Sequence, residues 1–437
     1  MTFLNGNRDM TYKDITMILM SLLMTACSSG GDAVTTLPTD TSQVQTTVTA
    51  APSETKVSIT TPAVPTEPVD LEKGLTDEMY SRALISEGNR SRLAAVMNRA
   101  EKGEPITVAT IGGSITQGSL ASSPNNCYAS LFYQYWQEKF PSSEVTFVNA
   151  GIGGTDSYLG VHRADTQLLC YEPDVVVVEF SVNDTDKLMN KYSYDSLVRK
   201  ILTSDSAPAV ILLFTTQDNG ASLWETHCEI GKAYDLPMLS YREAVYPEVA
   251  AGTLDWKAIS PDNIHPNDAG HSLIGQIMSR YLDGVYNDRG SIDTSDLSFS
   301  ADPYTSDYYK DGHIVGAEGI EAEEISGFEI GGNYVYPELF PDNFVTEGEG
   351  YLKFECDCRC LGLFYLKQTD GNGGKYEVYI DGARKGTVDA DFSGGWGNYG
   401  ATQQILISKE TAHHTVEIKL AEGSSKTALT ILGIMLS

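Results

Sequence analysis

The sequence has little positive charge. Its 437 residues include 30 lysines and arginines against 59 aspartates and glutamates, which gives a formal net charge of -29 at pH 7. A surface of that sign repels phosphate backbones and anionic lipid headgroups. We therefore expect no nucleic-acid partner, whereas neutral and cationic substrates are compatible with the charge.

The sequence also lacks paired cysteine motifs. Its seven cysteines contain no C-x-x-C pair, and no group of His, Cys, Asp and Glu has the spacing of metal ligands. We expect neither a metal nor another cofactor. Cys356, Cys358 and Cys360 alternate in "CDCRC", which predicts that they share one face of a strand as small buried side chains. Metal binding or a disulfide is the alternative, and the spacing assigns no disulfide pairs.

Long hydrophobic runs are scarce. The apolar stretch at residues 15–26 follows basic residues and is too short to span a bilayer, which is typical of a signal peptide. Ala26 before Cys27 resembles the lipobox of bacterial lipoproteins. That resemblance implies a signal peptide over residues 1–27, lipidation of Cys27 and an extracytoplasmic, cell-surface protein. An ordinary secretory signal, or a leader with a chance cysteine, is the alternative.

Residues 28–75 form a segment of Thr, Ser, Pro and Ala with scattered acids, as in "TTLPTDTSQVQTTVTAAPSETK". Such a composition buries too little apolar surface to offset the entropy lost on ordering. We interpret the segment as a linker that holds a folded domain away from the membrane.

Residues 76–286 alternate between helical and strand patterns, which predicts an α/β domain. The amphipathic segment 76–103 is predicted to be helical. Apolar runs such as "DVVVVEF" are typical of strands that are buried on both faces of a parallel sheet. The strand candidates are residues 106–111, 145–149, 175–180, 210–214 and 237–241. Helical stretches separate them, and a last helix closes the domain near Tyr286.

The pattern changes to a period of two after residue 304, so residues 303–437 are predicted to form an all-β domain. Alternating strands are expected in "GYLKFECDCRCLGLFYLKQ", "KYEVYIDGARKGTVD", "TQQILISK" and "HTVEIKL", with a hairpin turn at Asp381 and Gly382. A β-sandwich accounts for these strands.

Polar residues follow three of the predicted parallel strands, where such sheets bind ligands. Ser114 follows two glycines after the first strand, "NAGIGGTDS" follows the second, and "EFSVND" follows the third. Farther along the chain, Asp262 lies three residues before His265 in "SPDNIHPNDAGH", just ahead of the closing helix. A glycine-serine turn is also common without any catalytic role, so a plain tight turn is the alternative for Ser114.

These residues supply what acyl transfer to a serine requires. Ser114 offers the hydroxyl, His265 an imidazole to accept its proton, and Asp262 a carboxylate to orient that imidazole. The backbone N–H groups of Ser114 and Gly154 and the side-chain amide of Asn183 are candidate oxyanion donors.

Structural roles are the alternatives for several of these residues. His265 and Asp262 could serve only at the start of the following helix, and Asn183 could only stabilise a turn. The remaining central histidines are interpreted as packing or surface residues; they are His162, His227 and His271.

The four blocks together resemble the SGNH hydrolases, also called the GDSL esterase/lipase superfamily, over residues 104–286. The matching blocks are "GGSIT", "NAGIGG", "SVND" and "DNIH". The resemblance implies a three-layer α/β/α, flavodoxin-like sheet, nucleophile Ser114, oxyanion-hole Gly154 and Asn183, and the pair Asp262 and His265. Gly113 replaces the Asp of the name-giving motif, and Ser181 replaces a usual Gly. An α/β-hydrolase fits less well, because its nucleophile lies deep in the chain.

"GEPITVATIGGSITQG" is similar to SGNH carbohydrate esterases of gut and rumen bacteria, many of which carry an extra β-sandwich, here expected to be jelly-roll-like. Together with the signal-peptide-like leader, the resemblance implies an extracytoplasmic serine esterase that hydrolyses short acyl esters, O-acetyl above all, on poly- or oligosaccharides through an acyl-enzyme. A lipase, lysophospholipase or thioesterase is one alternative. A non-catalytic carbohydrate-binding surface lipoprotein is another.

Aromatic residues cluster in two parts of the predicted β domain. Their flat faces suit the apolar face of a pyranose ring. Packing within the domain is one alternative, and a β domain that shapes or walls the catalytic cleft is another. The residues are Tyr334, Tyr336, Trp396 and Tyr399.

Overall fold

A six-stranded sheet forms the centre of the first half of the protein. The computed structural model describes residues 65–437, so the predicted signal peptide, the lipidation site Cys27 and most of the predicted linker lie outside the described residues. The strand order is β1-β6-β5-β4-β2-β3, with β2 to β6 parallel and β1 antiparallel to β6. The strands are β1 (Leu84–Ser86), β2 (Ile106–Gly112), β3 (Val145–Gly151), β4 (Val175–Glu179), β5 (Ala209–Phe214) and β6 (Met238–Ser240).

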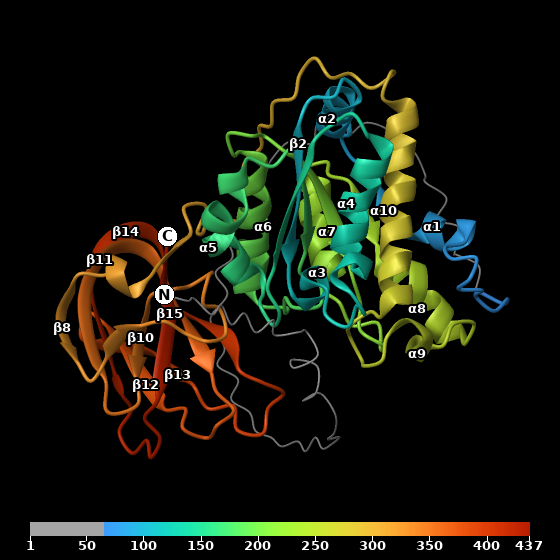
Figure 1. Cartoon of the computed structure of the whole chain (residues 1–437). Helices are drawn as coiled ribbons and strands as arrows, with labels where there is room; N and C mark the ends of the chain where they lie inside the picture. Colours follow the sequence, from blue (N-terminus) through green and yellow to red (C-terminus); the bar gives the residue numbers. More distant parts are fainter. Residues whose placement is uncertain (1–64) are drawn as a thin grey trace, which may run out of the picture. The chain divides into compact units, whose positions relative to one another are not determined.

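Helices cover both faces of this sheet and give two separate cores. One face packs against α2 (Ser91–Glu101), α4 (Tyr128–Lys139), α8 (Tyr241–Ala251) and α10 (Asp268–Asp288), and the other against α5 (Ser157–Gln167), α6 (Leu188–Leu202) and α7 (Trp224–Ala233). Figure 1 shows α5 and α6 on one side of β2 and α4 and α10 on the other. Three shorter helices complete the domain: α1 (Asp77–Ala83), α3 (Ser114–Gln117) and α9 (Trp256–Ile259).

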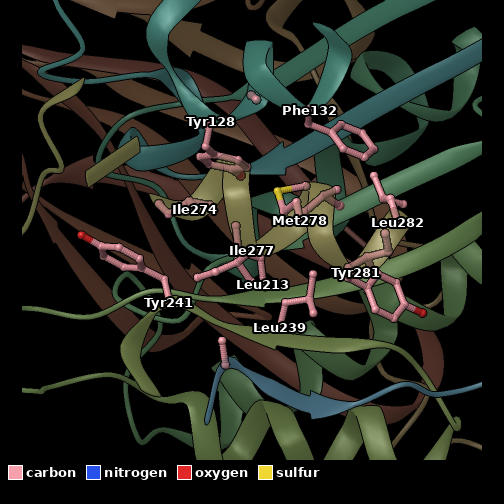
Figure 2. Packing of buried hydrophobic residues seen from close by; sticks show 14 of the residues in the cluster. Tyr128, Phe132, Leu213, Leu239, Tyr241, Ile274, Ile277, Met278, Tyr281 and Leu282 are labelled. Carbon is pink, nitrogen blue, oxygen red and sulfur yellow. The ribbon is translucent and has the colours of Figure 1, made fainter. Parts of the chain in front are cut away.

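The burial of the central strands explains this arrangement. Every residue of β4 and β5 is buried, so both faces of these strands need a helical cover. On one face, Ile277 and Met278 of α10 pack beside Tyr128 and Phe132 of α4 (Figure 2). The predicted three-layer α/β fold with its flavodoxin-like parallel order is confirmed.

The prediction of a helix over residues 76–103 is wrong in its middle. The segment folds as α1, then β1, then α2, because Leu84 and Ser86 pair antiparallel with β6 at the edge of the sheet. Gly88 follows with a φ of 55°, in the left-handed region that ends regular structure. The amphipathic pattern of the sequence continues across residues 84–86, so it gives no sign of the strand between the two helices.

Nine antiparallel strands form the C-terminal domain, as the alternating pattern of the sequence after residue 304 predicts. Their path is β13-β12-β14-β11-β15-β10-β9, with β7 paired to β15 and β8 to β11. The strands are β7 (His313–Val315), β8 (Ala322–Ser326), β9 (Glu329–Gly331), β10 (Asn343–Thr346), β11 (Tyr351–Lys367), β12 (Lys375–Ile380), β13 (Ala383–Asp389), β14 (Tyr399–Leu420) and β15 (Leu429–Leu436).

Long strands connect the two parts of this β domain. The first part of β11 pairs with β8 and the second with β15, while β14 runs beside β11 throughout. The hairpin predicted at Asp381 and Gly382 joins β12 to β13, with φ values of 52° and 75°. The boundaries given to the predicted segments from the sequence stay predictions.

Two details of the β domain differ from expectation. The patterns "TQQILISK" and "HTVEIKL" belong to one continuous strand, β14, rather than two. The three alternating cysteines do not share a face, because the register of β11 shifts between Cys358 and Cys360. Cys358 lies in the core of the β domain, whereas Cys360 lies in the core that contains α5 and α6.

The second core of the α/β domain is shared with the β domain. It includes Tyr158 and Leu159 of α5 together with Phe364 of β11 and Met435 of β15. The whole stretch Val64–Ser437 therefore forms one compact unit. In the part of the chain that the structure describes, no helix has the length and apolar character needed to cross a membrane.

Candidate active site

The turn after β2 presents Ser114 at the carboxyl edge of the sheet. β2 ends at Gly112, and Ser114 is the first residue of the short helix α3. A Cβ atom at Gly112 would overlap the side chain of Thr116 and the backbone of Glu179, so only glycine fits beneath the turn. Ser114 is 8% exposed in this otherwise packed turn.

Ser114, His265 and Asp262 form a continuous hydrogen-bonded chain. Nε2 of His265 lies 2.8 Å from Oγ of Ser114. Nδ1 of the same ring lies 2.7 Å from Oδ2 of Asp262. The arrangement that the sequence predicts is therefore present, and it has the geometry by which an imidazole can take the proton of a serine hydroxyl.

The loop that carries Asp262 and His265 is held by residues that the sequence reasoning missed. The Oγ atom of Ser260 donates to the carbonyl oxygens of Asp262, at 2.9 Å, and His265, at 2.6 Å. Trp256 of α9 donates its Nε1–H to the carbonyl oxygen of Asp262 at 2.6 Å. In the sequence, Ser260 and Trp256 lie just before "DNIH", but neither residue type by itself indicates that it supports a catalytic loop.

Backbone and side-chain donors keep the carboxylate of Asp262 charged. Burial opposes ionisation, but the imidazole of His265 and the backbone N–H groups of His265 and Ile264 outweigh it and lower the pKa of Asp262 to about 2. The two backbone donors lie 2.7 Å and 2.8 Å from Oδ1. The carboxylate therefore remains ionised over the whole neutral and mildly acidic range.

The three predicted oxyanion donors lie on separate loops at the same sheet edge. Gly154 has a φ of 73° in the loop after β3, and Asn183 lies in the loop after β4. Gln117 of α3 accepts a hydrogen bond at 2.9 Å from the N–H of Gly153, the residue before Gly154, and this bond holds the loop after β3 against α3. Among the described residues, neither the N–H of Ser114 nor that of Gly154 has a backbone acceptor.

Gly113 allows Asn183 to approach Ser114. A Cβ atom at Gly113 would overlap the side-chain amide of Asn183. The departure from the Asp of the name-giving motif thus leaves room for the amide directly beside Ser114. The second departure, Ser181, is buried and accepts a hydrogen bond from the N–H of Thr215 at 2.7 Å, so it joins the ends of β4 and β5.

Two aromatic residues of the β domain lie against the loop that carries Gly154. A Cβ atom at Gly154 would lie 3.5 Å from the indole of Trp396 and 3.6 Å from the ring of Tyr399. The two rings stack on each other with centroids 4.9 Å apart. The sequence placed these residues in a separate domain, with a wall of the catalytic cleft as one alternative for that domain, and did not indicate which residues would lie there.

The other two aromatic candidates differ from each other. Tyr336 packs against Phe340 and Phe364, and its hydroxyl accepts a hydrogen bond from the N–H of Gly400. Tyr334 is 74% exposed, and its hydroxyl contacts the side chain of Asn398, between Trp396 and Tyr399. Tyr334, Trp396 and Tyr399 thus form an exposed aromatic surface, and Tyr336 packs beneath it.

The remaining central histidines are buried, so of the two interpretations, packing or surface, packing applies. Burial lowers the pKa of His162 to about 3 and that of His271 to about 4. Nδ1 of His162 lies 2.7 Å from the carbonyl oxygen of Tyr158, and Nδ1 of His271 accepts from the N–H of Tyr128 at 3.3 Å. His227 pairs with Asp184 and is considered below.

Comparison with known proteins fits this geometry. Residues 110–273 match the GDSL-like Lipase/Acylhydrolase family. A crystal structure of a two-domain esterase (CEX) active on acetylated mannans is 33% identical in sequence, covers 82% of this chain and 97% of its own, and superposes with a TM-score of 0.75. The chain belongs to the GDSL-like lipase/acylhydrolase family. It is an esterase of the SGNH type.

A second crystal structure of the mannan-active esterase is 32% identical to this SGNH esterase, with a TM-score of 0.75 and coverage of 82% of this chain and 98% of its own. Both matches therefore include the β domain as well as the α/β domain. Thioesterase 1/protease 1/lysophospholipase L1 of Escherichia coli K12 is 25% identical over 190 residues, which is 41% of this chain and 85% of the relative.

Proposed function

We propose that this protein is an extracytoplasmic serine esterase that removes O-acetyl groups from mannan-type polysaccharides or oligosaccharides. The observation that carries the proposal is the hydrogen-bonded chain from Ser114 through His265 to Asp262, with an exposed aromatic surface beside it. The family membership accounts for the ester hydrolysis. The finer assignment rests on the arguments below.

Ser114 is the nucleophile in this proposal. His265 takes the hydroxyl proton at Nε2 while Oγ attacks the acetyl carbonyl, which forms the bond from Oγ to carbon. Asp262 stabilises the imidazolium through Nδ1. Collapse of the tetrahedral intermediate breaks the bond to the sugar oxygen, which receives the proton from His265. Water then hydrolyses the acetyl-enzyme by the same steps and releases acetate.

The oxyanion is stabilised by donors that are fixed before the substrate binds. The N–H groups of Ser114 and Gly154 and the amide of Asn183 each come from the end of a different parallel strand. Preorganised donors of this kind contribute roughly 10²- to 10³-fold each to kcat. The hydrogen bond between Gln117 and Gly153 holds the loop of Gly154 near Ser114. The close contact with Gly113 holds the amide of Asn183 there.

The aromatic surface supports a sugar substrate. Trp396 is 58% exposed, although it lies against Gly154 of the oxyanion hole. An indole face left open at that position suits stacking on a pyranose that carries the reacting ester. The two-domain relative is active on acetylated mannans, and the similarity to it spans the β domain that supplies Trp396. The net charge of -29 also suits a neutral glycan better than an anionic one.

The location outside the cytoplasm rests on the sequence alone. The short apolar stretch, the lipobox-like Cys27 and the Thr- and Pro-rich segment that follows together support a lipid-anchored enzyme on a linker. A polymeric glycan substrate suits an enzyme held at the cell surface. Labelling with a radioactive fatty acid, compared between wild type and Cys27→Ser, tests the anchor separately from the enzyme activity.

The substrate proposal is tested by the release of acetate from a matched panel. Acetylated mannan, acetylated xylan, an aryl acetate and a long-chain acyl ester are compared at equal ester concentration. We expect the highest kcat/KM on acetylated mannan and the lowest on the long-chain ester. A preference for the long-chain ester would overturn the glycan assignment and favour the lysophospholipase-like alternative. Binding to mannan with no ester hydrolysis at all would favour the non-catalytic alternative.

A further inference from the structure

A second aspartate-histidine pair lies buried beneath the oxyanion hole. Nε2 of His227 lies 3.0 Å from Oδ2 of Asp184, and both side chains are fully buried. Asp184 directly follows Asn183, the predicted oxyanion donor. Unlike His265, His227 has no access to Ser114 or to solvent, so this pair takes no direct part in proton transfer.

The carboxylate of Asp184 joins the two loops that carry the oxyanion donors. Its Oδ1 accepts a hydrogen bond from the backbone N–H of Ser157, at 2.8 Å. Ser157 is the first residue of α5 and lies three positions after Gly154. The loop after β4 is thereby attached to the end of the loop after β3, and the attachment lies one residue from Asn183 and three from Gly154.

Asn190 makes the same connection a second time. Its Nδ2 atom lies 3.2 Å from Oδ2 of Asp156 and 3.4 Å from Oδ1 of Asp184. Its Oδ1 accepts from the N–H of Thr185 at 3.1 Å and from the hydroxyl of Thr185 at 2.8 Å. Asn190 is 1% exposed, so these bonds do not compete with water.

His227 holds the carboxylate in place from the opposite side. Its ring stacks on Tyr194 of α6 with centroids 3.5 Å apart and an angle of 2° between the planes. Nδ1 of His227 is buried and makes no hydrogen bond, so within the described residues Asp184 is the sole side-chain partner of this imidazole. Because the imidazole of His227 is buried and has one partner, its single N–H has little freedom to point anywhere but toward Asp184.

We propose that His227 and Asp184 are positioning residues that set the separation between the two oxyanion donors Gly154 and Asn183. The inference rests on the proposed function, because it assigns to those donors their role in ester hydrolysis. The imidazole fixes the carboxylate, the carboxylate fixes the start of α5, and the two loops cannot shift independently. Loss of the pair leaves the nucleophile and its base intact but misplaces the donors, so kcat falls while KM changes little.

The test combines variants of the pair with removal of the donor itself. His227→Leu removes the N–H that holds Asp184, and His227→Gln keeps a donor of similar reach. Each is measured in the wild-type background and with Asn183→Ala, by the hydrolysis of an aryl acetate that needs no sugar binding. His162→Gln is the matched control, since His162 is also buried but bonds only to the backbone carbonyl of Tyr158 within α5.

We expect His227→Leu to lower kcat roughly 10- to 100-fold with an unchanged KM, and His227→Gln to recover most of that loss. With Asn183→Ala already present, His227→Leu is expected to lower kcat by a clearly smaller factor than in the wild type, because one of the two donors that the pair positions is then gone. His162→Gln is expected to lower the melting temperature with little effect on kcat.

Equal factors in the two backgrounds would overturn the inference, since they would show that His227 acts through overall stability. A loss of kcat for His162→Gln as large as that for His227→Leu would overturn it as well. Failure of the wild-type enzyme to hydrolyse the aryl acetate would instead contradict the proposed function. Should His227→Leu not fold, the same cycle with Asp184→Asn in place of His227→Leu decides the question.

Discussion

The imidazole of His265 lies 2.8 Å from the hydroxyl oxygen of Ser114, although 151 positions separate the two residues in the chain. The parallel sheet makes this contact possible. Ser114 follows β2, which lies inside the sheet between β4 and β3. His265 comes from the loop before α10, and this loop lies at the same edge of the sheet. The contact makes the serine a candidate nucleophile rather than a plain turn residue.

Replacement of Asp262 by asparagine should abolish most of the activity without unfolding the protein. The amide keeps the size of the side chain but not the charge that stabilises the imidazolium, and it favours the wrong tautomer of His265. We expect kcat to fall roughly 10²- to 10⁴-fold. Steady-state kinetics on an aryl acetate measures the effect. A decrease of less than threefold would show that Asp262 does not orient His265.

The same substitution should change the pH dependence of stability in a defined direction. The pKa of Asp262 is lowered to about 2 in the folded protein, so its contribution to stability is present above its ordinary value near 4. That contribution is lost as the pH falls through about 2. The wild type should therefore melt at a higher temperature than Asp262→Asn at pH 7, and the difference should disappear near pH 2. Equal melting temperatures at pH 7 would contradict this.

Asp156 should show the opposite dependence on pH. Burial, with the nearby charge of Asp184, raises the pKa of Asp156 to about 6. The stability associated with this shift is present below about pH 4 and is lost as the pH rises through about 6. Asp156→Asn, which can still cap α5, is thus expected to gain in melting temperature relative to wild type between pH 5 and pH 8. A constant difference over that range would refute the assignment.

A methyl group at Gly113 should displace the amide of Asn183. The added Cβ atom of Gly113→Ala overlaps that amide, so one proposed oxyanion donor moves away from Ser114. We expect kcat to fall about 10- to 10³-fold with little change in KM. Gly284→Ala is the control, because nothing lies near Gly284 in α10 and alanine there stabilises a helix by about 1 kcal/mol. Equal activity of the two variants would contradict the close contact.

Removal of the exposed indole should affect sugar substrates selectively. We expect Trp396→Ala to raise KM for acetylated manno-oligosaccharides about 10-fold or more and to leave an aryl acetate nearly unaffected. Tyr171→Ala is a matched control, since Tyr171 is similarly exposed at 54% but lies in a turn before β4. Parallel losses on both substrates would show that Trp396 supports the oxyanion loop instead of the sugar.

Much of the fold could be predicted because the buried parallel strands carry strong local signals. The continuous valines of β4 predict burial on both faces, and the structure agrees. The short edge strand β1 could not be found, because three residues gain their strand conformation only from pairing with β6. The face of Cys360 was mispredicted for a similar reason, since a register shift within β11 leaves no mark on the alternating pattern.

In the site, too, residues within short sequence motifs could be predicted, whereas contacts between distant segments could not. Ser114, Asp262 and His265 lie in short blocks whose spacing could be recognised, and the structure brings them together. Trp396 could not be assigned to the site, because its contact with Gly154 joins segments more than two hundred residues apart and depends on how two domains pack. His227 was interpreted only as a packing or surface residue, because its partner Asp184 lies on another element and no motif connects them.

The most direct test of the account is the time course of acetate release from acetylated mannan by the wild type and by Ser114→Ala. The account predicts steady release by the wild type and a loss of roughly 10⁴-fold or more in the variant, whose fold and melting temperature should remain close to those of the wild type. Release by Ser114→Ala at a rate comparable to that of the wild type would show that Ser114 is not the nucleophile.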